Sequence, residues 1–377
     1  MRRILIFSLA YYPRHVGGAE VAVKEITARI PAAEASFDMI VLNGGGEPLT
    51  ERVGNVTVHR VLSRFGTFQK LRYPFAAARL ARKLHKEQPY DLVWSIMASY
   101  AGYAGHLFKK SFPSVPLVLT IQEGDHFGRR QGPLAPLFRK IFAHADRIQA
   151  ISKFLSDWSV VMGATGDIDI VPNGVDYARF AAPISPERRY EMRQSLGFDP
   201  TDAVMVTASR LVFKNAVDEI IRSLADLEPN YKLLILGSGP DEASLRSLAL
   251  SLKVSHRIAF KGFVSHEELP AYLQASDIFV RPSRTEGLGN SFLEAMAAGI
   301  PVIGTPVGGI PDFLTDGETG LMCEVDNPRS IAQKAVKLVR DRESRDYIVS
   351  TARALVQEKY QWDAIAARMK DILWTTK

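Results

Sequence analysis

Two glutamates, Glu286 and Glu294, stand eight residues apart in the second half of the chain. The residues after Glu286 predict a loop that leads into a helix, with Glu294 in the first turns of that helix. A helix N-terminus that follows glycines presents unpaired N–H groups and a partial positive charge, so it can bind an anion. The predicted loop and N-cap consist of Gly287, Leu288, Gly289 and Asn290.

Carboxylates beside an anion site indicate a particular class of ligand. They would repel a bare phosphate, whereas a phosphate that carries hydroxyl groups on both sides would suit them, because carboxylates accept hydrogen bonds from hydroxyls. We therefore expect ribose hydroxyls to reach one glutamate and the hydroxyls of a donor sugar to reach the other. The alternative is an ordinary strand–turn–helix unit with two solvated glutamates.

Two cations, Arg210 and Lys214, follow a buried strand predicted over residues 203–208. At the carboxyl end of a strand, this pair can bind both phosphates of a diphosphate. It would also stabilise the negative charge of a departing nucleoside diphosphate. Two surface cations without a ligand are the alternative interpretation.

Two further groups of candidates follow predicted strands in the first half. Gly17 and Gly18 lie between a strand at 3–8 and a helix from about 19 to 30, where glycine lets backbone N–H groups approach an oxyanion; a plain tight turn is the alternative. Open α/β sheets bind ligands at the carboxyl ends of their strands. Four residues after the strand at 116–121 are therefore candidates for contact with the donor sugar or the acceptor hydroxyl. They are Gln122, Glu123, Asp125 and His126.

The length of 377 residues favours two domains, each with its own core. Predicted strands alternate with helices, which is typical of α/β domains with parallel sheets. We place the boundary at the VPNGVD turn, giving domains of 1–172 and 173–361. The turn Gly237-Ser238-Gly239 lacks the third glycine of the dinucleotide fingerprint, so NAD binding is disfavoured.

A single cysteine, Cys323, excludes an internal disulfide and fits a reducing compartment. We expect it to be a buried apolar residue.

No apolar run reaches the roughly 18 residues needed to span a bilayer. We interpret the apolar residues near the N-terminus as the first buried strand and expect a cytoplasmic protein.

Positive charge is concentrated in the first half of the chain. Residues 1–180 contain 23 basic and 15 acidic residues, and Arg60 to Lys86 holds eight basic residues and no acidic one. Leu71, Phe75 and other apolar residues interleave with these cations, which predicts a basic amphipathic helix suited to an anionic membrane surface or a phosphate-bearing acceptor. A solvated helix face is equally compatible, and nucleic acid is disfavoured because no nucleic-acid motif accompanies the charge.

Several of these strings together resemble one enzyme family. The segment RPSRTEGLGNSFLEAMAAGIPVIGT from Arg281 to Thr305 resembles the Glu-x7-Glu signature of retaining glycosyltransferases of family 4. The strings SRLVFKN at 209–215 and VPNGVD at 171–176 are also similar to that family. The resemblance implies a GT-B fold, with two Rossmann-like domains facing a central cleft and a terminal helix, about 362–377, that crosses back to the first domain.

The resemblance also implies roles for single residues. Glu294 would accept hydrogen bonds from ribose, Glu286 would orient the sugar, and Arg210 and Lys214 would bind the diphosphate. Gly17 and Gly18 would face that diphosphate from the first domain. The backbone that meets the nucleotide base would be that of Gly262, Phe263 and Val264.

The chain departs from the family pattern at two positions. Gln122 stands where many relatives carry a histidine, and Asn215 stands where a glycine often follows the lysine. We count Asp125 among the catalytic candidates, and we do not transfer the missing histidine's role to His126.

The activity that the resemblance implies is transfer of a hexose from a UDP- or GDP-sugar to an acceptor hydroxyl with retained configuration. We expect front-face attack, no cofactor and no metal, because cationic side chains take the metal's place. The expected acceptor is a lipid-linked or cell-surface glycan precursor, reached at the inner face of the membrane. The alternatives are a nucleotide-sugar epimerase or phosphorylase of similar fold, and a non-catalytic partner subunit that binds nucleotide-sugar. The sequence does not identify the sugar, the base or the acceptor.

Overall fold

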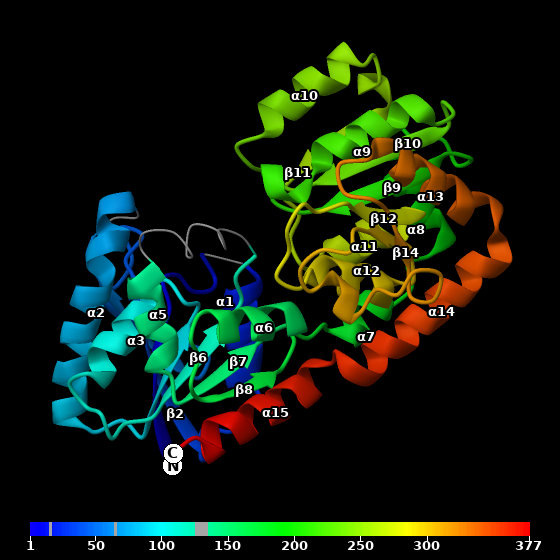
Figure 1. Ribbon diagram of the computed structural model, residues 1–377. Coiled ribbons are helices and arrows are strands. Elements are labelled where there is room, and N and C mark those ends of the chain that lie inside the picture. The colour runs from blue at the N-terminus through cyan, green and yellow to red at the C-terminus, as the bar shows by residue number, and fades with distance from the viewer. Residues whose placement is uncertain (15–16, 64–65, 125–134) are drawn as a thin grey trace. The chain divides into compact units, whose positions relative to one another are not determined.

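The computed structural model describes residues 1–14, 17–63, 66–124 and 135–377. These residues form two compact units (Figure 1). The N-terminal unit comprises Met1–Gly174 and Trp362–Lys377, and the C-terminal unit comprises Val175–Gln361. The chain passes from the N-terminal unit to the C-terminal unit after Gly174 and returns at Trp362.

The N-terminal unit is built on one sheet with the strand order β3-β4-β2-β1-β5-β6-β7-β8. Every described pair in it is parallel except β3 with β4, which form an antiparallel hairpin. The strands are β1 (Arg2–Phe7), β2 (Ala35–Leu42), β3 (Thr50–Val53), β4 (Val56–Val61), β5 (Leu92–Ile96), β6 (Leu117–Ile121), β7 (Arg147–Ala150) and β8 (Asp167–Ile170).

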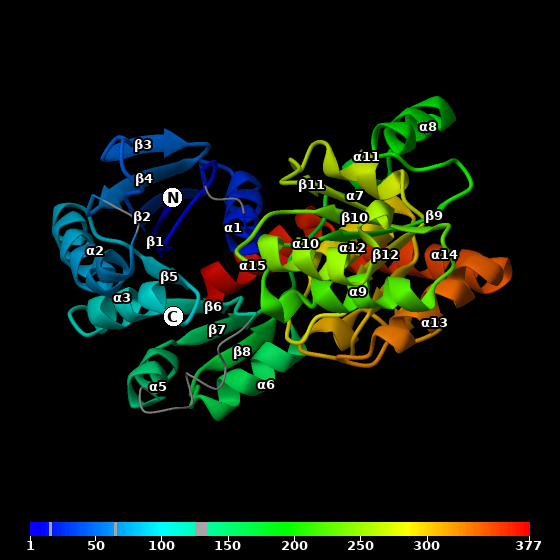
Figure 2. The ribbon, with the colours of Figure 1, turned by 90° about the horizontal axis from the view of Figure 1, so that it is seen from above.

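Helices cover both faces of this sheet, which explains why its central strands are continuous apolar runs. The helices α1 and α15 pack on one face and α2 and α3 on the other (Figure 2). The helices are α1 (Gly18–Ala28), α2 (Thr67–Glu87), α3 (Tyr100–Lys109), α5 (Ala135–Ala143), α6 (Lys153–Val161) and α15 (Trp362–Thr375).

The last helix returns to the N-terminal unit, as expected. Ile365, Met369 and Ile372 of α15 are buried in the same core as Ile4 and Met39. The start of α15 packs closely on the end of the unit's first segment. A Cβ added at Gly174 would lie 2.7 Å from the Trp362 ring, so only glycine fits there.

Arg60 does not belong to the basic helix that the charge pattern predicted. It lies in β4, is 8% exposed and pairs with Glu47 and Glu51. The helix that follows, α2, begins at Thr67. Its buried face is formed by Tyr73, Pro74, Ala77, Ala78 and Ala81, whereas Leu71 and Phe75 are exposed.

The C-terminal unit contains a parallel sheet with the order β11-β10-β9-β12-β13-β14 in its described residues. Its strands are β9 (Ala203–Ala208), β10 (Tyr231–Leu236), β11 (Ile258–Gly262), β12 (Ile278–Arg281), β13 (Val302–Gly304) and β14 (Leu321–Met322). Its helices are α7 (Tyr177–Ala181), α8 (Pro186–Ser195), α9 (Val217–Ser223), α10 (Glu242–Ser251), α11 (Leu269–Gln274), α12 (Asn290–Ala298), α13 (Pro328–Arg340) and α14 (Arg342–Lys359).

Cys323 follows β14 and is 2% exposed, which confirms that it is a buried residue. Burial raises the pKa of its thiol to about 12.

Among the helices of the described residues, none combines the length and the apolar character needed to cross a membrane.

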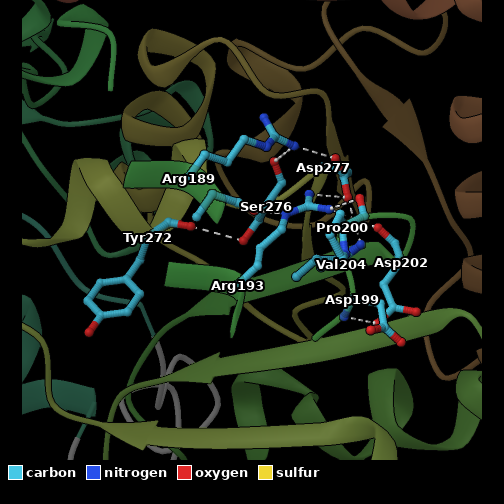
Figure 3. A network of polar contacts seen from close by, with 10 residues as sticks. Arg189, Arg193, Asp199, Pro200, Asp202, Val204, Tyr272, Ser276 and Asp277 are labelled. Carbon is cyan, nitrogen blue, oxygen red and sulfur yellow. Dashed lines mark hydrogen bonds and ion pairs between the residues drawn. The ribbon is translucent and has the colours of Figure 1, made fainter. Parts of the chain in front are cut away.

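A polar network anchors α8 at the amino end of the C-terminal sheet (Figure 3). Asp277, just before β12, accepts hydrogen bonds from Arg189 at 2.6 Å and from Arg193 at 2.7 Å. The same carboxylate accepts the backbone N–H of Val204 in β9 at 2.7 Å. These contacts fix the start of two neighbouring strands whose opposite ends carry the candidate site.

Candidate active site

The predicted cation loop and the predicted glutamate loop lie side by side in the C-terminal unit. They follow β9 and β12, which are parallel neighbours, so both loops leave the same edge of the sheet. The backbone N–H of Arg284, in the loop after β12, donates to the carbonyl of Lys214 at 2.7 Å. The structure therefore brings together the segments that carry Arg210, Lys214 and Glu286.

The helix after Glu286 begins and ends at glycines. Gly289 is the N-cap of α12 and has a φ of +102°, so Asn290 is the first residue of the helix rather than its cap. Gly299 ends the helix with a φ of +80°, as the sequence predicted. Glu294 lies in the second turn and is 8% exposed.

The Glu286 carboxylate is buried, and two of the described residues bind it. Its Oε1 accepts the backbone N–H of Gly287 at 3.0 Å, and its Oε2 pairs with the guanidinium of Arg281. An ionised carboxylate has about four acceptor positions, so these two bonds leave capacity for the hydroxyls of a ligand. The backbone of Glu286 is confined too, because a Cβ added at Gly308 would lie 1.7 Å from the Glu286 carbonyl oxygen.

Arg281 connects the two loops, although no motif in the sequence indicates a role for it. It donates to Ser291 Oγ at 2.8 Å and to Asn215 Oδ1 at 3.1 Å, besides its ion pair with Glu286. Asn215 in turn donates to the backbone carbonyl of Arg210 at 2.6 Å. The sequence offered one signal for this network, which is that Asn215 replaces a small residue next to the lysine.

Glu294 pairs with a histidine from the loop after β11. His266 Nε2 lies 3.1 Å from Glu294 Oε1. His266 follows the predicted base-contacting residues, of which Gly262 has a φ of +78° and Phe263 is 71% exposed. The structure thus places the loop expected to meet the base next to the glutamate expected to meet ribose.

The glycines of the Gly237-Ser238-Gly239 turn pack against the cation loop. A Cβ at Gly237 would lie 1.9 Å from the Ser209 carbonyl oxygen, and a Cβ at Gly239 would lie 2.2 Å from that of Leu211. Close backbone packing therefore explains these glycines without a dinucleotide.

A second arginine, Arg284, holds the loop of Lys214 by contacts with the residues around it. It forms a two-bond ion pair with Asp218 at 2.9 Å and donates to the carbonyl of Phe213 at 2.7 Å. Its guanidinium lies 4.1 Å from the centre of the Phe213 ring. Burial alone would raise the pKa of Asp218, but the hydrogen bonds and charge of Arg284 outweigh burial and lower it.

In the N-terminal unit, the glycine loop is partly occupied by a side chain. Gly17 is the N-cap of α1, and its N–H donates to Glu20 Oε2 at 3.0 Å. Burial raises the pKa of Glu20. Gly17 and Gly18 are both exposed, but a diphosphate oxygen at the Gly17 N–H would have to replace this carboxylate.

Two of the candidates after β6 are structural partners of one another. Glu123 is 1% exposed and accepts backbone N–H groups from Ala98 at 2.5 Å and from Gln122 at 3.0 Å. The Gln122 side chain accepts a hydrogen bond from Asn173 at 3.1 Å. Both residues thus hold the turn after β6, and contact with a sugar stays a prediction for them. Asp125 and His126 lie outside the described residues.

An Asp-x-Asp string occurs in the sequence, at Asp167 and Asp169 in β8. Asp169 forms an ion pair with Arg147 at 2.6 Å. This pairing gives the string a structural role in holding β7 to β8.

Two family models match the chain. The model described as "Glycosyltransferase Family 4" matches residues 16–179, and the model described as "Glycosyl transferases group 1" matches residues 188–355. Together they cover every described strand of the two sheets except β1.

Named relatives match most of the chain. A GDP-mannose-dependent monoacylated alpha-(1-6)-phosphatidylinositol monomannoside mannosyltransferase from Corynebacterium glutamicum is 34% identical over 315 residues, which cover 78% of this chain and 79% of the relative. A GDP-mannose-dependent alpha-(1-6)-phosphatidylinositol monomannoside mannosyltransferase from Mycobacterium tuberculosis is 28% identical, over 99% of this chain and 98% of the relative.

Solved structures share the fold. A sucrose-phosphate synthase from Thermosynechococcus elongatus superposes with a TM-score of 0.85 at 20% identity, covering 99% of this chain and 98% of that one. Anabaena HepE in complex with UDP and glucose superposes with a TM-score of 0.82 at 20% identity over the full length of both chains.

The family models, the mannosyltransferase relatives and the shared two-unit architecture confirm the resemblance seen in the sequence: the chain belongs to the family 4 glycosyltransferases and has the GT-B fold.

Proposed function

We propose that this glycosyltransferase moves a hexose from a nucleotide-sugar, with GDP-mannose as the first donor to test, to a hydroxyl of a lipid-linked acceptor. The observation that carries the proposal is the 2.7 Å backbone bond between Arg284 and Lys214, which joins the cation loop to the glutamate loop. The relatives named above support GDP-mannose and a phosphatidylinositol glycolipid, and the UDP complexes of HepE keep UDP-sugars among the candidates.

In this proposal, the C-terminal unit binds the donor. Arg210 and Lys214 bind the diphosphate oxygens, and the partial positive charge at the start of α12 adds to them. Glu294 accepts hydrogen bonds from ribose hydroxyls, and the remaining acceptor positions of Glu286 orient the sugar. Phe263, exposed on its loop, lies against the base.

The transfer breaks the bond between the anomeric carbon and the β-phosphate oxygen and forms a bond from that carbon to the acceptor oxygen on the same face. The sugar passes through an oxocarbenium-like state. The leaving phosphate takes the proton of the acceptor hydroxyl, so no side-chain nucleophile is needed. Asp125, Gln122, Glu123 and His126 remain candidates for contacts with the acceptor.

A donor screen followed by a transfer assay tests this proposal. A nucleoside diphosphate that binds should raise the melting temperature, because a ligand specific to the folded state stabilises it. Lys214→Ala should lower kcat by about 10²- to 10³-fold with the fold intact. Lys334→Ala, at a lysine on α13 that pairs with Asp316, is the control and should keep full activity.

Three results would contradict the proposal. Full activity of Lys214→Ala would remove the assigned diphosphate site. Conversion of the donor without an acceptor would identify an epimerase instead. An inverted product would exclude the front-face route.

We also propose that the reaction needs no metal ion, because Arg210 and Lys214 supply the positive charge that a metal would otherwise bring to the diphosphate. Transfer rates with the purified protein should be equal with and without EDTA. A rate that falls with EDTA and returns with a divalent cation would contradict this.

We further propose that α2 docks on an anionic lipid surface. Phe68, Leu71 and Phe75 are 67%, 57% and 60% exposed. Among the exposed cations, Arg72 lies within this patch, and Arg79, Lys83 and Lys86 follow it toward the end of the helix. An apolar patch followed by cations on one helix face can insert rings among acyl chains while the charges meet phosphate headgroups.

Vesicle co-sedimentation tests this docking. Binding to phosphatidylglycerol-containing vesicles should exceed binding to phosphatidylcholine vesicles and should weaken as salt rises. Arg79→Gln/Lys86→Gln should weaken it by roughly 30-fold, at about 1 kcal/mol per removed cation. Arg329→Gln/Lys359→Gln makes the same charge change on exposed residues of the C-terminal unit and should have little effect. Equal binding to both vesicle types would contradict the electrostatic account.

A further inference from the structure

Three buried polar side chains form a continuous connection inside the candidate site. Asn215 is 2% exposed, Glu286 is 7% exposed and Arg281 is 9% exposed. Arg281 lies between the other two, and one of its terminal nitrogens contacts both Asn215 Oδ1, at 3.1 Å, and Glu286 Oε2. Asn215 extends the connection to the backbone carbonyl of Arg210 at 2.6 Å.

The connection spans two loops that are distant in the sequence. Its first end lies on the loop that presents Arg210 and Lys214, and its second end lies on the carboxylate of Glu286. Arg281 is fixed by its place as the last residue of β12 and by a 2.8 Å bond to Ser291 at the start of α12. A rigid strand end and a helix therefore set the position of the guanidinium.

Charge explains why an arginine is suited to this place. The Glu286 carboxylate is buried close to a loop that we propose binds a diphosphate, so the two negative groups would repel each other strongly. The guanidinium of Arg281 compensates the negative charge of the carboxylate through its contact with Oε2. Its planar fork reaches several acceptors at once, which a lysine ammonium cannot do in the same geometry.

We propose that Asn215 and Arg281 are positioning residues that hold the Glu286 carboxylate at a fixed place relative to the Arg210–Lys214 loop during sugar transfer. This inference rests on the proposed function, because the sugar and the diphosphate that the two loops bind are parts of one donor. Misplacement of the sugar by about 1 Å against its leaving group costs roughly 10²-fold in rate. The connection therefore acts on the chemical step more than on binding of the nucleotide.

The test compares Arg281→Gln, Asn215→Ala and the double variant for kcat, donor KM and the dissociation constant of GDP or UDP. We expect each single variant to lower kcat by about 10- to 100-fold while the nucleoside diphosphate, which lacks the sugar, binds within about threefold of wild type. The double variant should lose about as much as one single variant, because both residues belong to one connection. Arg281→Lys should restore part of the lost kcat through its charge.

A matched control separates this role from general support of the fold. Arg257 is 6% exposed in the same unit and donates to the backbone carbonyls of Leu224, Glu228 and Tyr231. Arg257→Gln should lower the melting temperature as Arg281→Gln does but leave kcat unchanged, with all rates measured well below the melting temperatures.

The outcomes distinguish the two levels of inference. A wild-type protein that transfers no sugar from any donor overturns the proposed function itself. A wild-type protein that transfers sugar, with folded variants that keep kcat within twofold or with losses that add in the double variant, overturns the positioning role alone. Asn215→Ala keeps the test open if Arg281→Gln does not fold.

Discussion

Gly308 shows at the scale of one residue how closely the candidate site is packed. It has a φ of +57°, and an added Cβ would lie 1.7 Å from the Glu286 carbonyl oxygen. Gly317 of the same unit also has a left-handed φ, +81°, but no atom lies within 4 Å of its Cβ position. The two glycines therefore share the conformational requirement and differ in the contact.

Gly308→Ala is expected to displace the Glu286 backbone and to lower both stability and transfer rate. Gly317→Ala should lower stability by roughly 1–2 kcal/mol, the cost of a left-handed alanine, with kcat unchanged. Urea unfolding and steady-state kinetics on both variants measure the difference. Equal kcat for the two variants would show that the Glu286 backbone position does not matter for transfer.

His106 makes the stability of the N-terminal unit sensitive to acid. Burial, together with the nearby charges of His144, Lys110 and Lys140, lowers its pKa to about 4. The ordinary value is about 6.5, so below that pH the unfolded chain takes up a proton that the folded chain does not bind. The stabilisation is complete above pH 6.5 and is lost as the pH falls toward 4.

His106→Gln should remove this sensitivity. Between pH 7 and pH 5 the wild type should lose about 2 kcal/mol more of its unfolding free energy than the variant does. Urea titrations at the two pH values measure it. His256→Gln, at an exposed histidine of the C-terminal unit, should retain the wild-type loss; an equal loss in His106→Gln would refute the assignment.

At the scale of elements, Asp277 connects α8 to the amino ends of β9 and β12. Asp277→Ala leaves Arg193, which is 5% exposed, without its carboxylate. An unpaired buried charge typically costs about 3–5 kcal/mol, so the melting temperature should fall markedly. Glu228→Ala, which breaks the exposed pair with Arg340, should change stability by less than about 1 kcal/mol. A similar small change for Asp277→Ala would mean that α8 is held by other contacts.

The sequence predicted most elements of this fold because the evidence for them is local. Apolar runs such as residues 203–208 are strands, and Gly299 predicted where α12 ends, whereas Asn290, the predicted N-cap, is already the first residue of that helix. The hairpin of β3 and β4 was missed, although the Gly54-Asn55 turn between Val53 and Val56 was a signal for it. Which face of α2 is buried depends on the sheet beneath it, and the sequence alone did not show that Tyr73, Ala77 and Ala81 are the buried residues.

The candidate site was predictable in part for the same reason. Motif residues such as Lys214 and Glu286 follow the ends of predicted strands. Their place at the carboxyl edge of a parallel sheet could therefore be predicted. The partners of those residues come from other elements, and no local pattern pairs Arg281 with Asn215 or His266 with Glu294. Long-range polar contacts of this kind are what the sequence could not supply.

At the scale of the whole molecule, charge differs between the two units. The N-terminal unit carries 25 basic and 16 acidic residues, whereas the C-terminal unit carries 22 and 25. A basic unit suits an anionic lipid surface, and a unit of net negative charge needs local cations to bind a nucleotide. Raised salt should therefore slow transfer to an acceptor in anionic vesicles more than transfer to a short water-soluble acceptor, which parallel assays over a salt series can measure.

The path of the chain has one more consequence. Val175 bonds to Tyr360 at 2.6 Å within one unit, and Gly174 packs on Trp362 within the other. In each unit, the residues at which the chain leaves and returns are therefore neighbours, as in a domain that has been inserted into a host domain. A gene in which a few codons join residue 174 directly to residue 362 should encode an N-terminal unit that keeps its sheet and α15. The excised C-terminal unit can then be exchanged as one continuous segment between related proteins.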